Sequence, residues 1–404
     1  MKQVTILMIL LTVLSCRQKE VVNGKVQVIS HEGKDASCPF ITHDATGNMV
    51  VSWVEQDGSA ASGHMYYAVS NDNGYTFANP VMIPTSEGVF SHDENLPKLL
   101  FKPDGEVLAL FGVAANDERN KYAGKVMYTQ SLDGGRLWQP ARPLVTDTAG
   151  YDQRYFDMAL LPGGEVAAIW LDNRTTTAAE GAALYYAVTQ QHEGFQQAKT
   201  VSATVCQCCR TKMYVAPDGD IHLAYRKIIN DSIRDMVHQV SVDGGKTFSA
   251  PVRISADNWV VNGCPHTGPT LTANSQGLHF AWFTMGGGQG VFYCRSVDNG
   301  NTYTQKESLS RSPMAKHPQM TTIHDQVLVV WDEPVKWGND FNNRIGFQYK
   351  SAEGNTIKEG ILTNDSSYAN FPVLTAASGH TALMAYKRRN GDHSEVVVQV
   401  LDLP

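Results

Sequence analysis

The sequence predicts an all-β fold, a propeller of four-stranded antiparallel blades. Two observations lead to this prediction. The chain contains four near-copies of one octapeptide, Ser-x-Asp-(Asn/Gly)-Gly-x-x-aromatic, whose first serines are separated by 61, 110 and 55 positions. A turn followed by a short apolar strand with an aromatic residue near its end also recurs at a similar spacing. Repeats of this length are supersecondary units that bury a core only by packing against their neighbours.

The octapeptides occupy residues 70–77, 131–138, 241–248 and 296–303. Their Asp-Asn-Gly or Asp-Gly-Gly segment supplies the left-handed backbone that a tight hairpin requires. The Ser and Asp side chains can accept hydrogen bonds from nearby backbone N–H groups and fix the turn. Degenerate copies are expected at residues 189–195 and 351–356.

The second repeat gives the number of blades. Seven aromatic residues follow the recurring turns at intervals of 49 to 59 positions: Trp53, Phe111, Trp170, Tyr225, Trp282, Trp331 and Tyr386. We therefore expect seven blades, each with its first hairpin at one of these turns. The last unit has only three strands before the chain ends, and residues 25–30 can supply the fourth. Pairing of the N- and C-terminal strands would close the ring and remove its exposed edges.

The octapeptide resembles the Asp box, or BNR repeat, of sialidase-type β-propellers, and the repeats cover most of the chain. The resemblance implies a propeller fold. Because sialidase propellers have six blades, six is the alternative count. As a function, the resemblance implies an exo-acting glycoside hydrolase that acts on acidic glycans containing sialic or uronic acids. The sialidase Arg-Ile-Pro motif has no counterpart here, since the corresponding segment reads Ser37-Cys38-Pro39-Phe40.

Composition excludes some partners. The formal net charge is −7 and charged residues make up 18% of the chain. Nothing in this balance indicates nucleic-acid binding. We expect a carbohydrate substrate or ligand instead.

The N-terminus predicts export. Lys2, a short apolar stretch and Ser15 precede Cys16, which has the form of a signal peptide ending in a bacterial lipobox. We expect residues 1–15 to be the signal peptide, Cys16 to be lipidated, and residues 16–24 to form a short tether. Residues 25–404 would form one propeller domain at the bacterial cell envelope, on the outer membrane or the periplasmic face, held to the membrane by its lipid anchor alone.

The predicted topology separates two faces. The octapeptides and the recurring turns share one face, rich in Gly, Pro, Asp and Asn. The opposite face, here called the mouth face, collects the starts of the first strands and the ends of the second strands. The Cys, His, Arg, Tyr and carboxylate residues of these segments concentrate there, so we expect the chemistry at the mouth face.

Four arginines are candidates for substrate binding: Arg154, Arg174, Arg210 and Arg226. The guanidinium group binds carboxylates through two parallel hydrogen bonds, which suits an acidic sugar. The alternative for each is a structural ion pair with a nearby aspartate, such as Asp152 or Asp172.

Five residues are candidates for catalysis. The sialidase resemblance implies an arginine triad for the substrate carboxylate, an aspartic acid/base and a tyrosine nucleophile assisted by a glutamate. By their positions, Tyr368 or Tyr151 could serve as nucleophile and Asp93 or Glu94 as acid/base. His266 and His317 also start first strands, and imidazole is the usual proton shuttle near neutral pH. Histidine, tyrosine and arginine also serve in the seven-bladed, sialidase-like propellers that act on uronic-acid polysaccharides.

The cysteines leave two interpretations open. Besides Cys16 the chain has six, and an even number in an exported protein favours disulfides. The alternative is a soft-metal site for copper or zinc formed by Cys206, Cys208, Cys209, Cys264 and His266. No cofactor is otherwise implied.

Three functions therefore remain: an enzyme acting on acidic glycans, a propeller that binds glycans or proteins without turnover, and a metal-binding propeller. The enzyme is the preferred hypothesis.

Overall fold

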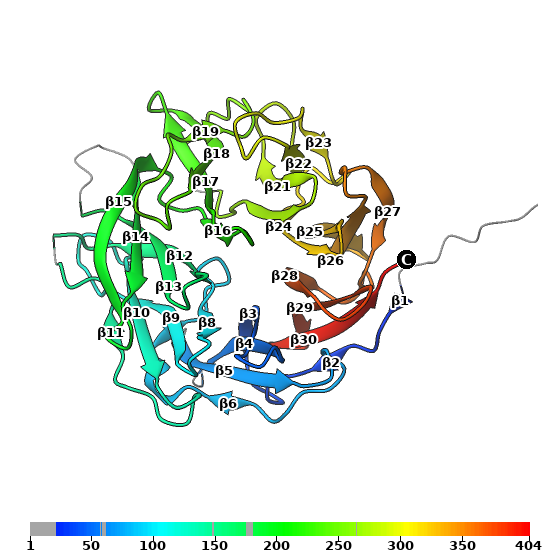
Figure 1. Ribbon diagram of the computed structural model, residues 1–404. Helices are drawn as coiled ribbons and strands as arrows, with labels where there is room; N and C mark the ends of the chain where they lie inside the picture. The colour runs from blue at the N-terminus through cyan, green and yellow to red at the C-terminus, as the bar shows by residue number, and fades with distance from the viewer. Residues whose placement is uncertain (1–21, 57, 59–61, 148, 175–180, 264) are drawn as a thin grey trace, which may run out of the picture.

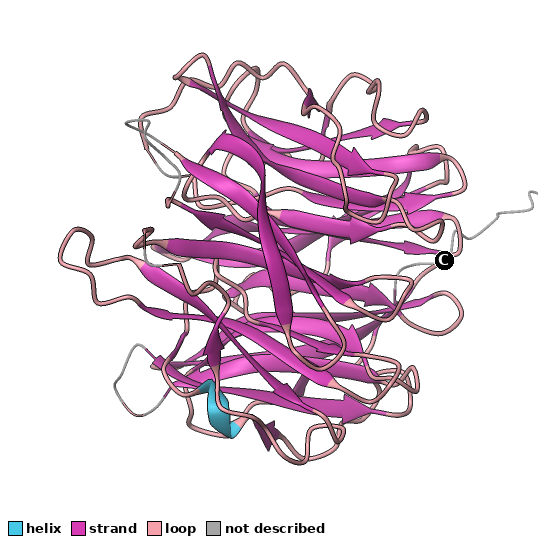
Figure 2. Cartoon of the chain, turned by 60° about the vertical axis from the view of Figure 1, so that its left-hand side comes forward, coloured by secondary structure: helices cyan, strands magenta, loops and turns pink. Residues whose placement is uncertain are grey.

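The fold is described from a computed structural model. It describes residues 22–404 except 57, 59–61, 148, 175–180 and 264; the predicted signal peptide, Cys16 and most of the predicted tether lie outside the described residues. Regular structure in the described part is almost entirely antiparallel strand, and its one helical segment is the short 3-10 turn η1, Pro84–Ser86 (Figure 2). The predicted all-β class is confirmed.

The strands form five hydrogen-bonded sheets. The largest contains β3 Ala36–His43, β4 Met49–Gln56, β5 Ser62–Ser70, β6 Val81–Met82, β7 Val89–Phe90, β8 Lys98–Phe101, β9 Val107–Ala114, β10 Gly124–Ser131 and β11 Arg142–Pro143. The second contains β12 Gln153–Leu160, β13 Val166–Asp172, β14 Ala182–Thr189, β15 Phe195–Val205, β16 Lys212–Val215, β17 Ile221–Ile229, β18 Ile233–Ser241 and β19 Val252–Arg253.

Two further sheets have four strands each. One consists of β20 Thr270–Asn274, β21 Gly277–Thr284, β22 Gly290–Ser296 and β23 Glu307–Ser308. The other consists of β24 Lys316–Ile323, β25 Gln326–Trp337, β26 Asp340–Lys350 and β27 Thr356–Ile361.

The fifth sheet joins the two ends of the described chain. It contains β28 Ala369–Ala376, β29 Thr381–Asn390, β30 His393–Asp402, β1 Val22–Asn23 and β2 Gln27–Val28. Both β1 and β2 pair with β30. Residues 25–30 therefore do contribute a strand beside the C-terminal one, as expected. Strand pairing also begins earlier than the expected boundary at Lys25, because the backbone of Val22–Asn23 is already in the sheet.

The sheets are arranged around a common centre (Figure 1). Strands β3, β8, β16 and β28 lie nearest this centre, and β11, β19 and β27 lie toward the outside. Consecutive inner strands contact one another: β3 with β8, β8 with β12, β12 with β16, β16 with β20, β20 with β24, β24 with β28, and β28 with β3.

The predicted aromatic repeat lies in the core. All seven aromatic residues are on second strands of their units and all are buried: Trp53, Phe111, Trp170, Tyr225, Trp282, Trp331 and Tyr386. They belong to the apolar clusters packed within and between adjacent units. Their regular spacing therefore reflects one packing position repeated along the chain.

The octapeptides form one recurring turn. In the copy at residues 296–303, Ser296 Oγ donates to Asp298 Oδ1 at 2.8 Å and accepts from Gly300 N at 2.9 Å, while Thr302 N donates to Asp298 Oδ1 at 2.8 Å. The same three bonds occur in the other copies. Gly300 has a φ of 87°, a conformation that favours glycine. In the degenerate copy at residues 351–356, Glu353 takes the position of the aspartate and accepts a hydrogen bond from Ser351 Oγ at 2.8 Å.

The octapeptide turns lie beside the recurring first-hairpin turns, as predicted. Gly134 N donates to Gly105 O at 3.1 Å, and Asn299 Nδ2 donates to Asp220 Oδ2 at 2.9 Å.

A bulge recurs near the start of the inner strands. In β3, β12, β24 and β28, one extra residue stands opposite the second strand. The bulge contains a non-glycine residue with positive φ: Cys38 at 57°, Tyr155 at 53°, His317 at 50° and Phe371 at 52°. His266, before β20, has the same conformation, with a φ of 54°. Bulges and strained backbone of this kind cluster next to active sites, where they redirect side chains.

No helix in the described part of the chain is long and apolar enough to cross a bilayer.

Candidate functional site

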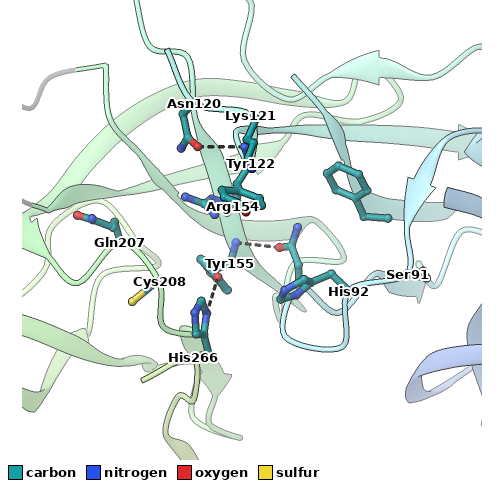
Figure 3. Close-up of a pocket in the computed structure, with 12 residues that line it drawn as sticks. Ser91, His92, Asn120, Lys121, Tyr122, Arg154, Tyr155, Gln207, Cys208 and His266 are labelled. Carbon is teal, nitrogen blue, oxygen red and sulfur yellow. Dashed lines mark hydrogen bonds between the residues drawn. The ribbon is translucent and has the colours of Figure 1, made fainter. Parts of the chain in front are cut away.

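The starts of four consecutive units surround a cavity of about 690 Å³. We call it the mouth pocket; Figure 3 shows its lining residues, which are Phe90, Ser91, His92, Asn95, Asn120, Lys121, Tyr122, Arg154, Tyr155, Gln207, Cys208 and His266. These residues precede or begin β8, β12, β16 and β20, apart from three that belong to the β9–β10 hairpin. The predicted concentration of chemistry-bearing side chains at the strand starts is therefore present in the structure.

A tyrosine–histidine pair lies in this pocket. Tyr155 Oη and His266 Nδ1 are 3.3 Å apart, and the two side chains point toward one another (Figure 3). The ring of His92 lies 6.5 Å from that of His266, between centroids. Burial raises the pKa of Tyr155 and lowers the pKa of His266. Both groups are therefore neutral near pH 7, an arrangement suited to proton transfer between them.

Tyr155 is held by the bulge and by the neighbouring unit. Its backbone N donates to Asn95 Oδ1 at 2.9 Å, and its carbonyl accepts from Thr211 Oγ1 at 2.8 Å. The side chain is 2% exposed. The strained backbone and these two bonds fix the phenol at the pocket wall.

The charge in the mouth pocket is positive. Arg154 and Lys121 line it, whereas no aspartate or glutamate is among its described lining residues. Arg154 Nη2 forms an ion pair with Asp152 Oδ2 at 2.5 Å, and its guanidinium lies over the ring of Tyr155. Among the described residues, the buried Arg154 Nε has no hydrogen-bond partner.

A chain of charged groups begins at Glu94, whose backbone N donates to His92 Nδ1 at 3.3 Å. Glu94 Oε2 is 3.0 Å from Arg210 Nε, and Glu94 Oε1 is 2.7 Å from His317 Nε2. His317 Nδ1 is 2.7 Å from Asp332 Oδ2, which also accepts from Phe371 N at 2.8 Å. The structure thus brings together Glu94, His317 and Arg210, three of the predicted site residues, although they come from different units.

The pKa values in this chain follow from its geometry. Burial opposes the charged form of His317, but the Asp332 and Glu94 carboxylates outweigh it and raise the pKa to about 9. Burial likewise opposes the charge on Glu94, yet Arg210 and His317 hold its pKa below the ordinary value. At neutral pH His317 is therefore an imidazolium clamped between two carboxylates. Its ring stacks on Phe371 with 4.3 Å between centroids.

A smaller cavity of about 240 Å³ is lined by the inner strands. In it Asp157 lies 3.4 Å from Lys98 Nζ and 3.6 Å from Lys212 Nζ. Burial is the main cause that lowers the pKa of Lys98, to about 8, and Lys212 and Arg210 lower it further while Asp157 opposes them. The cavity carries more positive than negative groups, and Arg210 also lines it.

Two predicted catalytic residues lie elsewhere. Asp93 forms an ion pair with Lys387 Nζ at 2.8 Å and accepts from Cys38 N at 3.1 Å. Tyr368 has a φ of 47° and packs against Arg389, whose guanidinium carbon lies 5.6 Å from the ring centroid. Neither residue lines the mouth pocket. Their catalytic roles stay predictions.

The four predicted arginines do not converge. Arg154 lines the mouth pocket, and Arg210 is paired with Glu94. Arg174 lies 3.5 Å from Asp172 and over the ring of Tyr185. Arg226 is buried and donates to the carbonyl oxygens of Arg234 and Phe283 at 2.9 and 2.8 Å.

For Arg226 this placement differs from the expected substrate-binding role, because both terminal nitrogens of its guanidinium are used by the backbone. For Arg174 the ion pair with Asp172 was the alternative that the sequence left open, and the structure contains it.

Three cysteines gather beside the mouth pocket. Cys206, Cys208 and Cys209 are buried, and their sulfurs all lie within 4.8 Å of one another. The pKa of Cys206 lies below the ordinary value because the other two thiols are hydrogen-bonded to its sulfur and Arg226 lies nearby. All five described cysteines, which include Cys38 and Cys294, are free thiols. The preferred expectation of disulfides is therefore wrong for these five; Cys264 lies outside the described residues.

Sequence reasoning missed several pocket residues. Tyr155 follows the predicted Arg154 directly, and its place at a strand start was the signal that could have found it. Asp332 does not line the mouth pocket but pairs with His317; it directly follows the recurring aromatic Trp331 on β25, and this position was the signal that could have found it. Asn120, Lys121 and Tyr122 reach the pocket from the β9–β10 hairpin, and nothing in their sequence indicates that this loop turns toward the centre.

Comparisons with known proteins bear on the fold. No family model and no curated protein matches this sequence. Among solved structures, a protein of unknown function from Dyadobacter fermentans is similar with a TM-score of 0.57 and 14% identity, over 95% of this chain and 99% of that one.

Two sialidases are also similar. The intramolecular trans-sialidase from Ruminococcus gnavus matches with a TM-score of 0.51 and 8% identity, over 91% of this chain and 96% of that one. The NanB sialidase from Streptococcus pneumoniae matches with a TM-score of 0.51 and 11% identity, over 93% and 70% of the two chains. At these identities the likeness concerns the fold alone, and we conclude that the chain has a sialidase-like fold.

Proposed function

We propose that the protein is an enzyme that cleaves a glycosidic bond next to a carboxylate-bearing sugar, with the mouth pocket as its active site. The observation that carries the proposal is the lining of this pocket. Arg154 and Lys121 supply positive charge, the neutral pair Tyr155–His266 supplies proton transfer, and no carboxylate is among the described lining residues. Cations and perturbed titratable groups in a concave pocket are typical of a functional site for an anionic ligand.

The substrate carboxylate would bind the guanidinium of Arg154, beside its ion pair with Asp152, together with Lys121. Phe90 and Tyr122 add apolar surface for a sugar ring. The pocket volume of about 690 Å³ is within the range of small-molecule sites. Sialic and uronic acids are the sugars that combine a ring with a carboxylate.

Hydrolysis is the first candidate reaction. Tyr155 would attack the anomeric carbon as its proton passes to His266, the bond from that carbon to the glycosidic oxygen would break, and the leaving oxygen would take up this proton from His266. Water, losing a proton to His266, would then attack the same carbon and break its bond to the Tyr155 oxygen, which would take that proton back. A tyrosine nucleophile is a known variant among glycosidases. In this scheme Tyr155 takes the place that the sequence assigned to Tyr368.

β-Elimination is the second candidate, and the absence of carboxylates among the described lining residues favours it, because glycosidases usually need a pair of them. In elimination neutral His266 would be the base: it would remove the proton on the carbon next to the substrate carboxylate, the bond from the adjacent carbon to the glycosidic oxygen would break, and a double bond would form between the two carbons. Tyr155 would donate the proton that the leaving oxygen takes up.

The experiment is a panel of sialylated oligosaccharides and uronic-acid polymers incubated with the protein. Release of saturated sugar identifies hydrolysis, and an ultraviolet-absorbing unsaturated sugar identifies elimination. Tyr155→Phe should lower kcat/KM by about 10²–10⁴-fold, the contribution of a positioned proton-transfer group. Tyr75→Phe, an exposed tyrosine in the first octapeptide turn, is the matched control and should leave it unchanged. Saturable binding without turnover across the panel would replace the enzyme by a glycan-binding propeller.

The proposal includes the finer architecture. The seven sequential groups of strands and the contact of β28 with β3 support a seven-bladed ring closed by β30 with β1 and β2. We also propose that Cys16 anchors the domain to the bacterial cell envelope, where acidic glycans are accessible.

A further inference from the structure

The three-cysteine cluster has no part in the proposed reaction and carries a separate inference. Cys206 follows β15, and Cys208 and Cys209 lie in the turn before β16. The Sγ atoms of Cys206 and Cys208 are 3.6 Å apart, and those of Cys206 and Cys209 are 3.7 Å apart. One short turn thus directs three sulfurs to one point.

These separations fit sulfurs that share an ion. A disulfide requires about 2.0 Å between sulfurs. Thiolates bound to one metal ion at about 2.3 Å stand roughly 3.8 Å apart in tetrahedral geometry and somewhat farther apart in a trigonal plane. The observed spacing is therefore close to that of a preformed coordination site.

The donor set selects a soft metal ion. It contains sulfur alone, since no imidazole nitrogen or carboxylate oxygen of the described residues joins the group within 4.8 Å. Thiolates favour Cu(I) and zinc over hard cations. Structural zinc takes four protein ligands, whereas this cluster offers three. Three thiolates suit Cu(I) better.

The surroundings can stabilise thiolate charge. Arg234 Nη1 lies 3.5 Å from Cys206 Sγ, and Arg234 Nε donates to Val261 O at 3.0 Å, which fixes the guanidinium. Buried thiolates need such a partner, because burial of an uncompensated charge is costly. Cys208 also lines the mouth pocket, so an ion can reach the cluster from solvent (Figure 3).

We propose that Cys206, Cys208 and Cys209 together bind a single Cu(I) ion as thiolates beside the mouth pocket. The thiols that ligate the ion release their protons, so Cu(I) affinity falls as the pH is lowered. The site is independent of the glycan-cleaving proposal, and its test does not use activity.

The experiment titrates the reduced full-length protein with Cu(I) under anaerobic conditions against a coloured Cu(I) chelator, with a parallel zinc titration. Wild type should take up one ion per chain and gain thermal stability with it, since binding to the native state alone stabilises it. Each of Cys206→Ser, Cys208→Ser and Cys209→Ser should bind Cu(I) at least about 10-fold more weakly than wild type. Even the loss of a residue that only contacts a metal ligand reduces metal affinity by this much. Cys294→Ala, a buried free cysteine in another unit, is the matched control and should bind like wild type.

Four results would overturn the proposal. They are no uptake of Cu(I) by the wild type, unchanged affinity in all three serine variants, zinc binding in preference to Cu(I), and a disulfide between two of the three cysteines in freshly isolated protein. Because the wild-type stability shift needs no substitution, the test holds even if a serine variant fails to fold.

Discussion

His317 Nδ1 lies 2.7 Å from Asp332 Oδ2, so a buried imidazole at the start of β24 is held by a carboxylate in the middle of the paired strand β25. On its other side, His317 Nε2 contacts Glu94 from a different unit. This arrangement raises the pKa of His317 to about 9 against the effect of burial. It links two units by charge.

This relationship predicts a loss of stability at alkaline pH. A group whose pKa is raised in the folded state contributes stability that is complete below its unfolded pKa, about 6.5 for histidine, and disappears as the pH rises through its folded pKa. The unfolding free energy from urea titrations should therefore decrease between about pH 6.5 and pH 9 because of His317. In His317→Gln this component should be missing. Identical pH profiles for the two proteins would contradict the prediction.

The same geometry predicts that Asp332→Asn lowers the pKa of His317. The amide leaves the shape of the site almost unchanged but removes one of the two negative charges that lie 2.7 Å from the imidazole. The NMR resonance of the His317 imidazole is assigned as the one that is missing from His317→Gln. Its pKa is then measured by pH titration in the wild type and in Asp332→Asn. Glu94 remains in contact with His317, so the pKa should fall without reaching that of a buried, unpaired histidine. An unchanged titration would show that Asp332 does not set the charge of His317.

The fold could be predicted because its signals are local. The aromatic residues such as Trp53 and Trp170 recur once in each unit, and each occupies the same buried place on a second strand. The octapeptide turns are fixed by bonds within a few residues, as between Ser296 and Asp298. Patterns of this kind need no knowledge of distant contacts.

The site was harder to predict because its contacts are not local. Glu94 and His317 are 223 positions apart and meet because the sheets are arranged around a common centre. The bulges that set the positions of Tyr155 and His317 have no sequence signal that we recognised. Arg226 shows the converse. Its residue type suggested substrate binding, but its depth in the core gives it a structural role.

The octapeptide turn predicts a stability cost on removal of one hydroxyl group. Ser296 is buried, and its Oγ both donates to Asp298 and accepts from Gly300 N. Ser296→Ala leaves that N–H without its partner, which should cost about 1–3 kcal/mol in unfolding free energy. The exposed Ser378→Ala is the control and should change it by less than about 0.5 kcal/mol. Equal urea midpoints for the two variants would show that the turn is not fixed by this bond.

The aspartates of these turns also predict acid sensitivity. Hydrogen bonds from Thr302 and Ser296 lower the pKa of Asp298 to about 2, and the pKa values of Asp72 and Asp133 are lowered in the same way. A lowered folded pKa contributes stability that is present above the unfolded pKa, about 3.9, and is lost as the pH falls through the folded pKa. Stability should therefore decrease between about pH 4 and pH 2. The decrease should be smaller in Asp298→Asn, as measured by thermal unfolding.

The mouth pocket predicts an acid limit for activity. Burial lowers the pKa of His266, so the imidazole stays neutral to a lower pH than ordinary histidine. If neutral His266 takes the proton of Tyr155, kcat/KM should fall only as the pH drops below about 6.5, the ordinary histidine value. The pH dependence of kcat/KM, measured on the substrate that the glycan panel identifies, tests this decrease. His266→Gln should remove the decrease along with most of the activity. If kcat/KM began to fall above pH 6.5, or if it fell with pH in the same way in His266→Gln, the proton transfer would belong to another group.

The pairing of β30 with β1 and β2 predicts that the first described residues stabilise the whole domain. Gln27 pairs with Val398 and Val28 with Val397, so these residues cover the edge of the C-terminal strand. Removal of residues 1–29 exposes this edge, and unpaired edges promote aggregation. We expect a lower melting temperature and concentration-dependent aggregation in light scattering. Removal of residues 1–21 alone is the matched control, because β1 and β2 remain, and it should melt like the full chain. Equal melting of the two truncated proteins would show that the ring does not depend on its N-terminal strands.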